Sequence, residues 1–153
     1  MKITIEVNRE LLNDEIVLRC RELTPEVMVL EQKLTELTNS AMQLEVMLND
    51  TTYYIRINEI CFVETSEGRV IVHTRDKYYT AEYKLYELDE LLPKNFARAS
   101  KSAIVNTDYI RAIRKNITGA SEIEFAGTAK KTYASRNYLK IIVEKLNEKR
   151  LGK

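Results

Sequence analysis

The pattern of apolar and polar residues changes character near residue 41. Before that point, apolar side chains alternate with polar ones in 3–7 and again in 16–20, which predicts two short, half-buried strands. A helical pattern follows, with valine and leucine at intervals of three and four residues from Val27 to Leu37. We therefore expect a small strand–strand–helix segment in this part of the chain.

Capping residues indicate where the helix begins. Thr24 is a suitable N-cap, Pro25 fits a first helical position that needs no N–H, and Glu26 favours the positive end of the helix dipole. Its end is open to two interpretations. Asn39–Ser40 indicates a single helix that stops there and packs on a sheet, whereas an apolar stripe continued through 41–48 would make a three-heptad coiled coil.

Short strands predominate in the remainder of the chain. Asn49–Asp50 and Glu67–Gly68 are turn candidates between the first of them. A helical pattern from Ala81 to Leu92 ends before Pro93, and a last helix is expected to start at its N-cap, Ser135. The predicted fold class is mostly β with a few helices. The expected strands are 53–57, 60–63, 70–74, 78–80, 103–106, 109–114, 122–126 and 130–134.

Length and composition are those of a folded protein. With 153 residues, 44% apolar and 31% charged, the chain can bury a core and is neither disordered nor fibrous. It is too short for a TIM barrel. No apolar stretch approaches the roughly 20 residues that span a bilayer, and the first residues lack a signal-peptide core. We expect a cytoplasmic protein.

The residues that usually carry catalysis are sparse. Cys20 and Cys61 are far apart in the sequence and are expected to be buried as small apolar side chains. His73 is the only histidine and lies in an alternating run, so a strand position is favoured over catalysis. The sequon at 116–118 is interpreted as a turn. Because nucleotide-binding, hydrolase and metalloprotease motifs are missing, we expect no enzyme, catalytic residue, cofactor, metal or small-molecule substrate.

Charge divides the chain into unlike parts. Residues 1–44 hold five basic and eight acidic residues, whereas 45–153 hold nineteen basic and fifteen acidic. Within 94–115 there are six basic residues and one acidic residue, and four more basic residues lie within 130–140. Local positive potential of this kind suits a polyanion, although a solvated basic face would have the same composition. Nine tyrosines, several beside basic residues, could stack on bases or simply occupy strands.

Five blocks together resemble the LytTR family of bacterial DNA-binding domains over roughly residues 43–147. The longest is Phe96–Asn106, which reads FARASKSAIVN, and the last is Ser135–Tyr138, at the start of the final helix. The others are Ile60–Glu64, the glycine turn around Gly68, and the helix of Leu85, Leu88 and Leu92. Residues 1–40 lie outside the resemblance and are too short for a phosphoacceptor receiver domain. Control by phosphorylation is therefore not expected.

The resemblance implies an elongated β fold that reads DNA through loops. Three segments match the family's contacting loops: Glu67–Arg69, Ser100–Ser102 and Arg136–Asn137. Arg69 and Lys101 would suit guanine and Asn137 adenine, while Arg136 beside a helix N-terminus would favour a nearby phosphate. The full set of expected DNA-binding residues is Arg69, Arg98, Ser100, Lys101, Ser102, Lys115, Arg136 and Asn137, of which Arg98, Ser100, Ser102 and Lys115 are assigned to phosphates. Val105 and Asn106 are expected to be structural.

The leading interpretation is a transcription regulator that binds double-stranded DNA sequence-specifically, as a homodimer on repeated half-sites. Residues 43–150 would form the LytTR-like domain, and residues 1–42 would supply dimerisation or contact a partner. One alternative is a protein-interaction module held by a membrane-bound or soluble inhibitor protein, with a merely solvated basic face. Another is an RNA-binding β domain.

Overall fold

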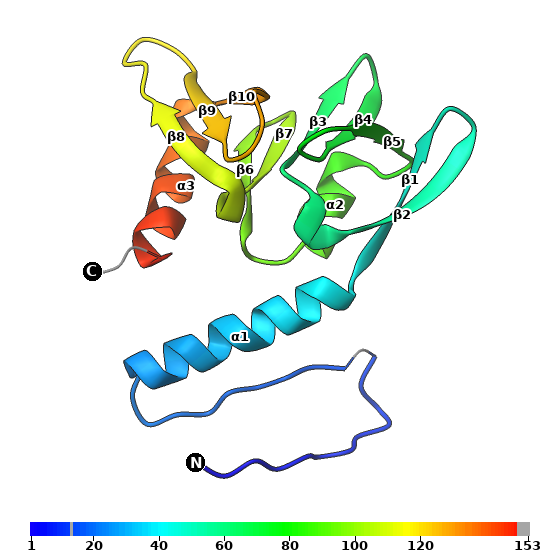
Figure 1. Cartoon of the computed structure of the whole chain (residues 1–153). Coiled ribbons are helices and arrows are strands. Elements are labelled where there is room, and N and C mark those ends of the chain that lie inside the picture. The colour runs from blue at the N-terminus through cyan, green and yellow to red at the C-terminus, as the bar shows by residue number, and fades with distance from the viewer. Residues whose placement is uncertain (13, 150–153) are drawn as a thin grey trace. The chain divides into compact units, whose positions relative to one another are not determined.

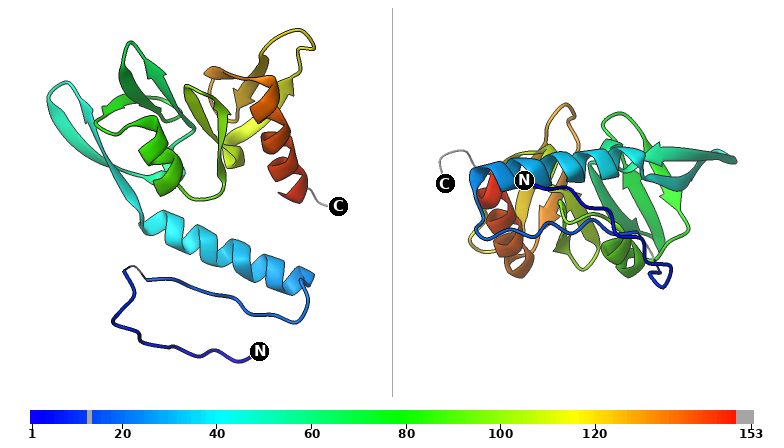
Figure 2. Two further views of the ribbon diagram at one scale, coloured as in Figure 1. Left: turned by 180° about the vertical axis from the view of Figure 1, so that it is seen from behind. Right: turned by 90° about the horizontal axis from the view of Figure 1, so that it is seen from below.

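The chain forms two structural units, Met1–Glu36 and Leu37–Lys153. A computed structural model describes residues 1–12 and 14–149, and Figures 1 and 2 show them from three directions. No helix within these ranges is long and apolar enough to cross a membrane.

The first unit contains most of one helix but no strand among its described residues. Helix α1 (Pro25–Ala41) begins as predicted, because Thr24 Oγ1 accepts a hydrogen bond from the Val27 N–H at 3.3 Å. The strands predicted at 3–7 and 16–20 are wrong for this single chain: the backbone is extended there without a hydrogen-bonded ladder. A segment with alternating apolar and polar residues forms a β-strand only where a neighbouring strand pairs with its backbone N–H and C=O groups. Cys20 is exposed, contrary to prediction, because no core surrounds it.

Strand β1 (Gln43–Leu48) follows α1, which excludes a coiled coil running to residue 48. Leu44 and Val46 are buried on one face of β1, so the apolar stripe changes from helical to strand spacing. The predicted turn at Asn49–Asp50 is confirmed, since both residues have positive φ angles of 48° and 63°.

The second unit contains a seven-stranded antiparallel sheet in the order β2-β1-β5-β4-β3-β7-β6. Strands β1 and β2 form a hairpin, as do β3 and β4, while β2 and β6 form the two edges. The bounds are β2 (Thr51–Arg56), β3 (Phe62–Ser66), β4 (Arg69–His73), β5 (Tyr78–Ala81), β6 (Phe96–Ser100) and β7 (Ala103–Asn106).

A three-stranded antiparallel sheet and a helix complete this unit. Strands β8 (Ile110–Arg114), β9 (Ser121–Phe125) and β10 (Lys131–Ala134) pair in the order β10-β9-β8. Helix α3 (Arg136–Lys149) follows β10 directly and packs against β6. The predicted fold class, mostly β with few helices, is confirmed.

Two apolar cores hold the second unit together. One lies between the seven-stranded sheet and helix α2 (Leu85–Leu91), with Leu88 and Val46 fully buried. The other joins the β6–β7 side of that sheet to the smaller sheet and to α3, through Phe125, Ile123 and Ile142. This second core fixes the ends of β6 and β7 relative to the start of α3.

Several local predictions need correction or are confirmed. Ala81 belongs to β5 rather than to a helix, because α2 starts only at Leu85, where the Glu87 carboxylate accepts the Lys84 N–H at 2.9 Å. Strand β6 was not predicted, since its alternating alanines carry little apolar signal. Asn106 is structural as predicted: its side chain is buried and donates to the Ile60 carbonyl at 2.9 Å.

Candidate nucleic-acid interface

Two backbone hydrogen bonds bring the three predicted contact segments to one edge of the domain. The Thr65 N–H, next to the β3–β4 turn, donates to the Ser102 carbonyl at 2.8 Å. The Ser135 N–H, directly before α3, donates to the Ala99 carbonyl at 2.8 Å. The segments Glu67–Arg69, Ser100–Ser102 and Arg136–Asn137 are therefore neighbours, although about 70 residues separate the first from the last.

A β-bulge directs the central segment toward α3. The pairing of β6 with β7 shifts register between Arg98 and Ser100, so Ala99 has no direct partner on β7. Its carbonyl is thereby available to the Ser135 N–H, which ties the end of β6 to the beginning of α3. The bulge thus determines where the 100–102 turn lies.

Side chains within this turn shape it and present one cation. Ser100 Oγ accepts the Ser102 N–H at 3.1 Å and lies 3.3 Å from Ser102 Oγ. The hydroxyl pair closes a tight turn around Lys101, whose side chain is exposed. Both serines therefore have local partners, whereas Lys101 faces solvent.

Arg98 is held by the protein rather than displayed. Its Nη1 donates to the Lys101 carbonyl at 2.9 Å and to the Ser100 carbonyl at 3.4 Å, and its Nε pairs with Asp89 at 3.3 Å. These bonds connect α2 to the turn and satisfy two of its carbonyl groups. The guanidinium consequently fixes the backbone on which Lys101 is carried.

The β3–β4 turn is the second part of the edge. Glu67 and Gly68 both have positive φ angles, 52° and 76°, which is the conformation of a tight hairpin turn and confirms the turn prediction. No other atom lies within 4 Å of a Cβ built on Gly68. Arg69 follows at the start of β4 with an exposed side chain. The turn therefore projects freely into solvent beside an arginine.

The start of α3 is the third part. Arg136 is the first residue of the helix, and the Ser135 carbonyl accepts the Leu139 N–H at 2.9 Å, which places Ser135 at the N-cap position. Arg136 and Asn137 are both exposed. The first N–H groups of a helix carry partial positive charge and favour an anion, so this end of α3 is suited to a phosphate group.

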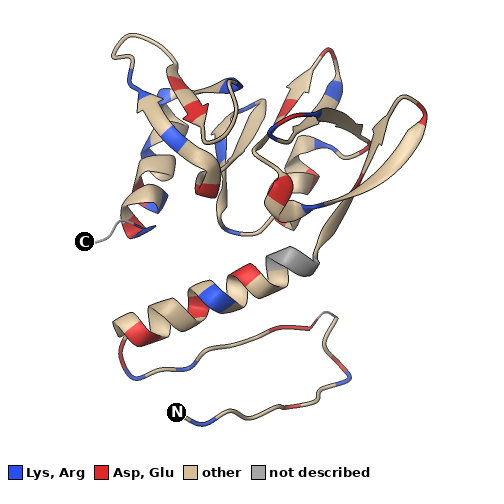
Figure 3. Cartoon of the chain, in the orientation of Figure 1, with Lys and Arg blue, Asp and Glu red and all other residues tan. Residues whose placement is uncertain are grey.

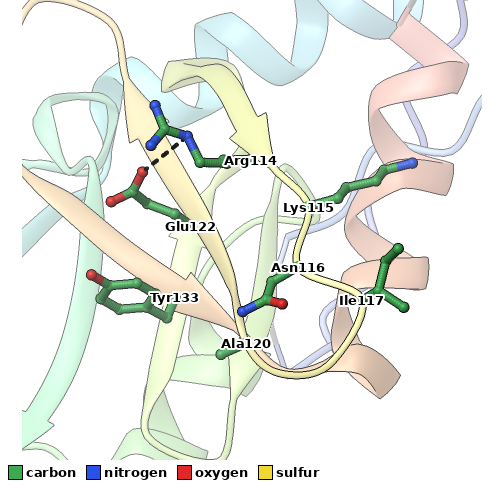
Figure 4. Close-up of a pocket in the computed structure, with 7 residues that line it drawn as sticks. All are labelled: Arg114, Lys115, Asn116, Ile117, Ala120, Glu122 and Tyr133. Carbon is green, nitrogen blue, oxygen red and sulfur yellow. Dashed lines mark ion pairs between the residues drawn. The ribbon is translucent and has the colours of Figure 1, made fainter.

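Lys115 belongs to none of these three segments and lies in the connection between β8 and β9, whose end pairs with the end of β10 through Ser121 and Ala134. That connection borders a shallow cavity of about 480 Å³, shown in Figure 4, where the Arg114 guanidinium pairs with Glu122 at 3.9 Å. Asn116 closes the loop by accepting the Thr118 N–H at 3.1 Å, which confirms a turn at 116–118. The cavity is lined by Arg114, Lys115, Asn116, Ile117, Ala120, Glu122 and Tyr133.

The structure separates the basic residues into two groups. Most of those in 98–149 have partners within the fold: Arg98, Arg111, Arg114, Lys130, Lys131, Lys145 and Lys149. Among the described residues, no hydrogen bond or ion pair engages the side chains of Arg69, Lys101, Lys115 or Arg136. Basic and acidic segments are interspersed over the domain (Figure 3), and other exposed cations such as Arg56 and Lys140 are equally unengaged among the described residues, so these four are distinguished by their sequence position rather than by availability alone.

A stacked cluster connects the two sheets behind this edge, and sequence reasoning did not identify it. The rings of His73, Phe62 and Phe125 are stacked, with centroid separations of 4.2 Å and 4.9 Å. His73 lies in β4 as predicted, and its Nε2 is 2.9 Å from Glu64 Oε1. Burial lowers the pKa of the His73 imidazole, against the opposing effect of Glu64. A single histidine in an alternating strand gives no sequence signal for contacts across sheets.

Lys130 and Arg75 reinforce the same junction. Lys130 Nζ donates to the carbonyls of Thr74 and Lys77, at 2.9 Å and 2.6 Å, and burial lowers its pKa. The Arg75 guanidinium lies 5.1 Å from the centre of the Tyr109 ring. In the described part of the chain, no group of three or more His, Cys, Asp and Glu residues is arranged to hold a metal ion.

A family model for the LytTr DNA-binding domain matches residues 50–147. The chain belongs to the LytTR family. The match includes all three segments of the edge, the whole second core and the first core except its β1 residues, such as Leu44 and Val46. The family assignment therefore gives this domain its general activity, which is DNA binding.

Known proteins similar to this LytTR chain agree with that assignment. The solved LytTr DNA-binding domain of a Bacillus cereus response regulator shares its fold, with a TM-score of 0.63 and 22% identity over 69% of this chain and 96% of that domain. An uncharacterized HTH-type transcriptional regulator of Staphylococcus aureus strain MSSA476 is 26% identical over 96% of this chain and 99% of its own length. A counterpart from the bovine strain RF122 is 27% identical over the same shares. A helix-turn-helix motif, after which these relatives are named, needs two α-helices joined by a short turn. In the described part of this chain no two α-helices follow one another directly.

Proposed function

We propose that this LytTR protein is a transcription regulator that binds double-stranded DNA sequence-specifically, as a homodimer on repeated half-sites. Its domain would contact each half-site through the edge formed by Glu67–Arg69, Ser100–Ser102 and Arg136–Asn137. Relatives named transcriptional regulators, similar over 96% of this chain, support the regulatory role.

One observation carries the contact assignment. Backbone hydrogen bonds at or beside the 100–102 turn link it to each of the other two segments, and each segment presents a cation that no described residue engages: Arg69, Lys101 and Arg136. Exposed cations held without internal partners are available to replace the counterions of DNA phosphates and to bind base edges. Loops projecting from a sheet fit this mode of binding, in which no recognition helix is needed.

We assign each side chain a separate role. Arg69 and Lys101 are suited to the O6 and N7 acceptors of guanine, and Asn137 to adenine. The N–H groups at the start of α3, with Arg136 beside them, would bind a phosphate, as would Ser100 and Ser102. Arg98 acts through the turn that it holds, so its own charge is the lesser part of its contribution. Lys115 would bind a further phosphate.

The experiment is a fluorescence anisotropy titration of the full chain with a duplex obtained by in vitro selection and with its scrambled counterpart. Each duplex is titrated at two salt concentrations, because a protein that neutralises phosphates loses affinity as salt rises. We expect tighter binding to the selected duplex at both concentrations. Equal affinity for the two duplexes, or binding that salt does not weaken, would refute the proposal.

A matched pair of variants tests the edge itself. Arg136→Ala should weaken binding, whereas Arg56→Ala removes the same charge from β2, at the opposite edge of the seven-stranded sheet from β6. Equal losses in both variants would mean that the edge is not the contact surface. Competition by single-stranded RNA at lower concentration than duplex DNA would favour the alternative of an RNA-binding domain.

A further inference from the structure

The first unit, Met1–Glu36, has no core of its own. None of its described residues is fully buried, and the side chains of Ile3, Ile5 and Val7 are between 84 and 90% exposed. A segment of this size cannot bury enough apolar surface alone, and sequences below about 40 residues usually depend on disulfides, metals or association. Its apolar side chains therefore need a surface that lies outside the unit.

The backbone at the start of this unit forms no strand ladder with any described residue. Residues 1–8 are extended, and a turn in which the Glu10 N–H donates to Asn8 Oδ1 at 3.0 Å follows them. Figure 1 shows this segment running without a neighbouring arrow. An extended segment with apolar alternation and open N–H and C=O groups is a template for another strand.

The sequence of the segment is complementary to itself in the antiparallel direction. It reads Lys2-Ile3-Thr4-Ile5-Glu6, so reversal about Thr4 places a basic residue opposite an acidic one and isoleucine opposite isoleucine. We infer that residues 2–6 of two copies pair as antiparallel strands about a two-fold axis through Thr4. Lys2 of each copy then lies opposite Glu6 of the other, and Ile3 opposite Ile5.

Other arrangements of the same segments are disfavoured. Parallel pairing in register would place Lys2 opposite Lys2 and Glu6 opposite Glu6. A slip of one residue would place Ile3 opposite a polar side chain and direct the two apolar sets to opposite faces. Only the register centred on Thr4 combines both charge pairs with one continuous apolar face.

A second copy is therefore the occupant that the charges of this segment specify. The first unit is also large enough to form a dimer interface, since a standard interface takes about 20–30 residues from each partner. This inference rests on the proposed function in one respect: it supplies the contact that would hold two DNA-binding domains together. The interaction itself does not require DNA.

Charge exchange between positions 2 and 6 tests this register. The dimer dissociation constant of the full chain is measured by sedimentation velocity for the natural protein, for Lys2→Glu and for Glu6→Lys. Each single change places like charges opposite one another and should weaken association by about tenfold or more. Mixing the two variants restores both opposite-charge pairs, so the mixture should associate nearly as well as the natural protein.

Position 4 provides a second, independent measurement. In a Cys20→Ser background, Thr4→Cys places two thiols opposite one another across the axis, and a short thiol-reactive crosslinker should join the copies rapidly. Asn8→Cys in the same background is the matched control. Its thiols would lie far apart along the pair of strands, so little crosslinking is expected.

Three results would overturn the inference. They are a full chain that stays monomeric at high concentration, charge variants that associate as well as the natural protein, and crosslinking no faster at position 4 than at position 8. A monomer would leave the apolar side chains of the unit to a different partner, such as an inhibitor protein or the chain's own second unit. The DNA titration tests the proposed function separately. A chain that stays monomeric but still prefers the selected duplex would refute the strand pairing and leave sequence-specific DNA binding intact. A chain that dimerises but shows no salt-sensitive DNA binding would refute only the proposed function.

Discussion

Replacing Lys101 with alanine should reduce sequence preference without reducing stability. The Lys101 side chain is exposed, and within the described ranges no hydrogen bond or ion pair uses it. Its backbone is held by others, since Arg98 Nη1 donates to the Lys101 carbonyl at 2.9 Å. The turn should therefore keep its shape in Lys101→Ala, and the free energy of unfolding should change by no more than about 0.5 kcal/mol.

The expected loss follows from the role proposed for this side chain. A good contact to a guanine edge contributes about 1–3 kcal/mol of discrimination, which corresponds to about 5- to 150-fold in relative affinity. The ratio of dissociation constants for scrambled and selected duplexes should fall by that factor. If Lys101 contacts only a phosphate, affinity falls uniformly for both duplexes, and the slope of log affinity against log salt decreases by about 1.

The matched comparison is Arg98→Ala, three residues away. This change removes the bonds to two carbonyl groups and the pair with Asp89, so it should lower the free energy of unfolding by about 1–3 kcal/mol. Urea unfolding and anisotropy titration on both variants separate the two roles. If Lys101→Ala were as destabilised as Arg98→Ala, or kept its full sequence preference, the reasoning about this turn would be wrong.

Three further outcomes test the core and the junction between the sheets. Asn106→Ala should lower the free energy of unfolding by about 1–3 kcal/mol, measured by urea titration, because the Ile60 carbonyl loses its buried donor. Phe125→Ala should cost about 3–5 kcal/mol in the same assay, since the ring is fully buried between the sheets, and a loss below 1 kcal/mol would contradict that packing. Burial lowers the pKa of His73 in the folded protein. Above about pH 6.5 the imidazole is neutral in both the folded and the unfolded chain, so the folded state keeps its full stability. As the pH falls from there toward the lowered pKa, the unfolded chain binds a proton first and the free energy of unfolding decreases. In His73→Gln, unfolding followed between pH 7.5 and 5 should depend less steeply on pH, and an unchanged slope would exclude His73 as the source.

Much of the second unit could be predicted from local sequence. Alternation at 70–74 and 122–126 predicts strands close to β4 and β9, and the turn at Glu67–Gly68 follows from a residue type that adopts positive φ without strain. The family resemblance adds the three contact segments. These features are encoded within a few residues of one another, so a single sequence reveals them.

Sequence patterns failed where the outcome depends on a distant partner. Residues 3–7 alternate as a strand does but pair with no other described residues, and Cys20 is exposed because no core surrounds it. Leu44 and Leu48 fit a continued helix equally well, until pairing of β1 with β2 and β5 makes them part of a sheet. Spacing along the chain cannot distinguish these cases, because the free energy that decides them comes from long-range contacts.

The sequence by itself determined the fold class, the start of each long helix, the turns and the identity of the basic residues. Only the tertiary structure decided which of those residues are used inside the protein and which face solvent. Arg98 and Lys101 are three positions apart and carry the same charge, yet one is bonded to the turn and the other extends from it. The difference arises from a bulge in β6 and from an aspartate on α2, and both depend on contacts between elements far apart in the sequence.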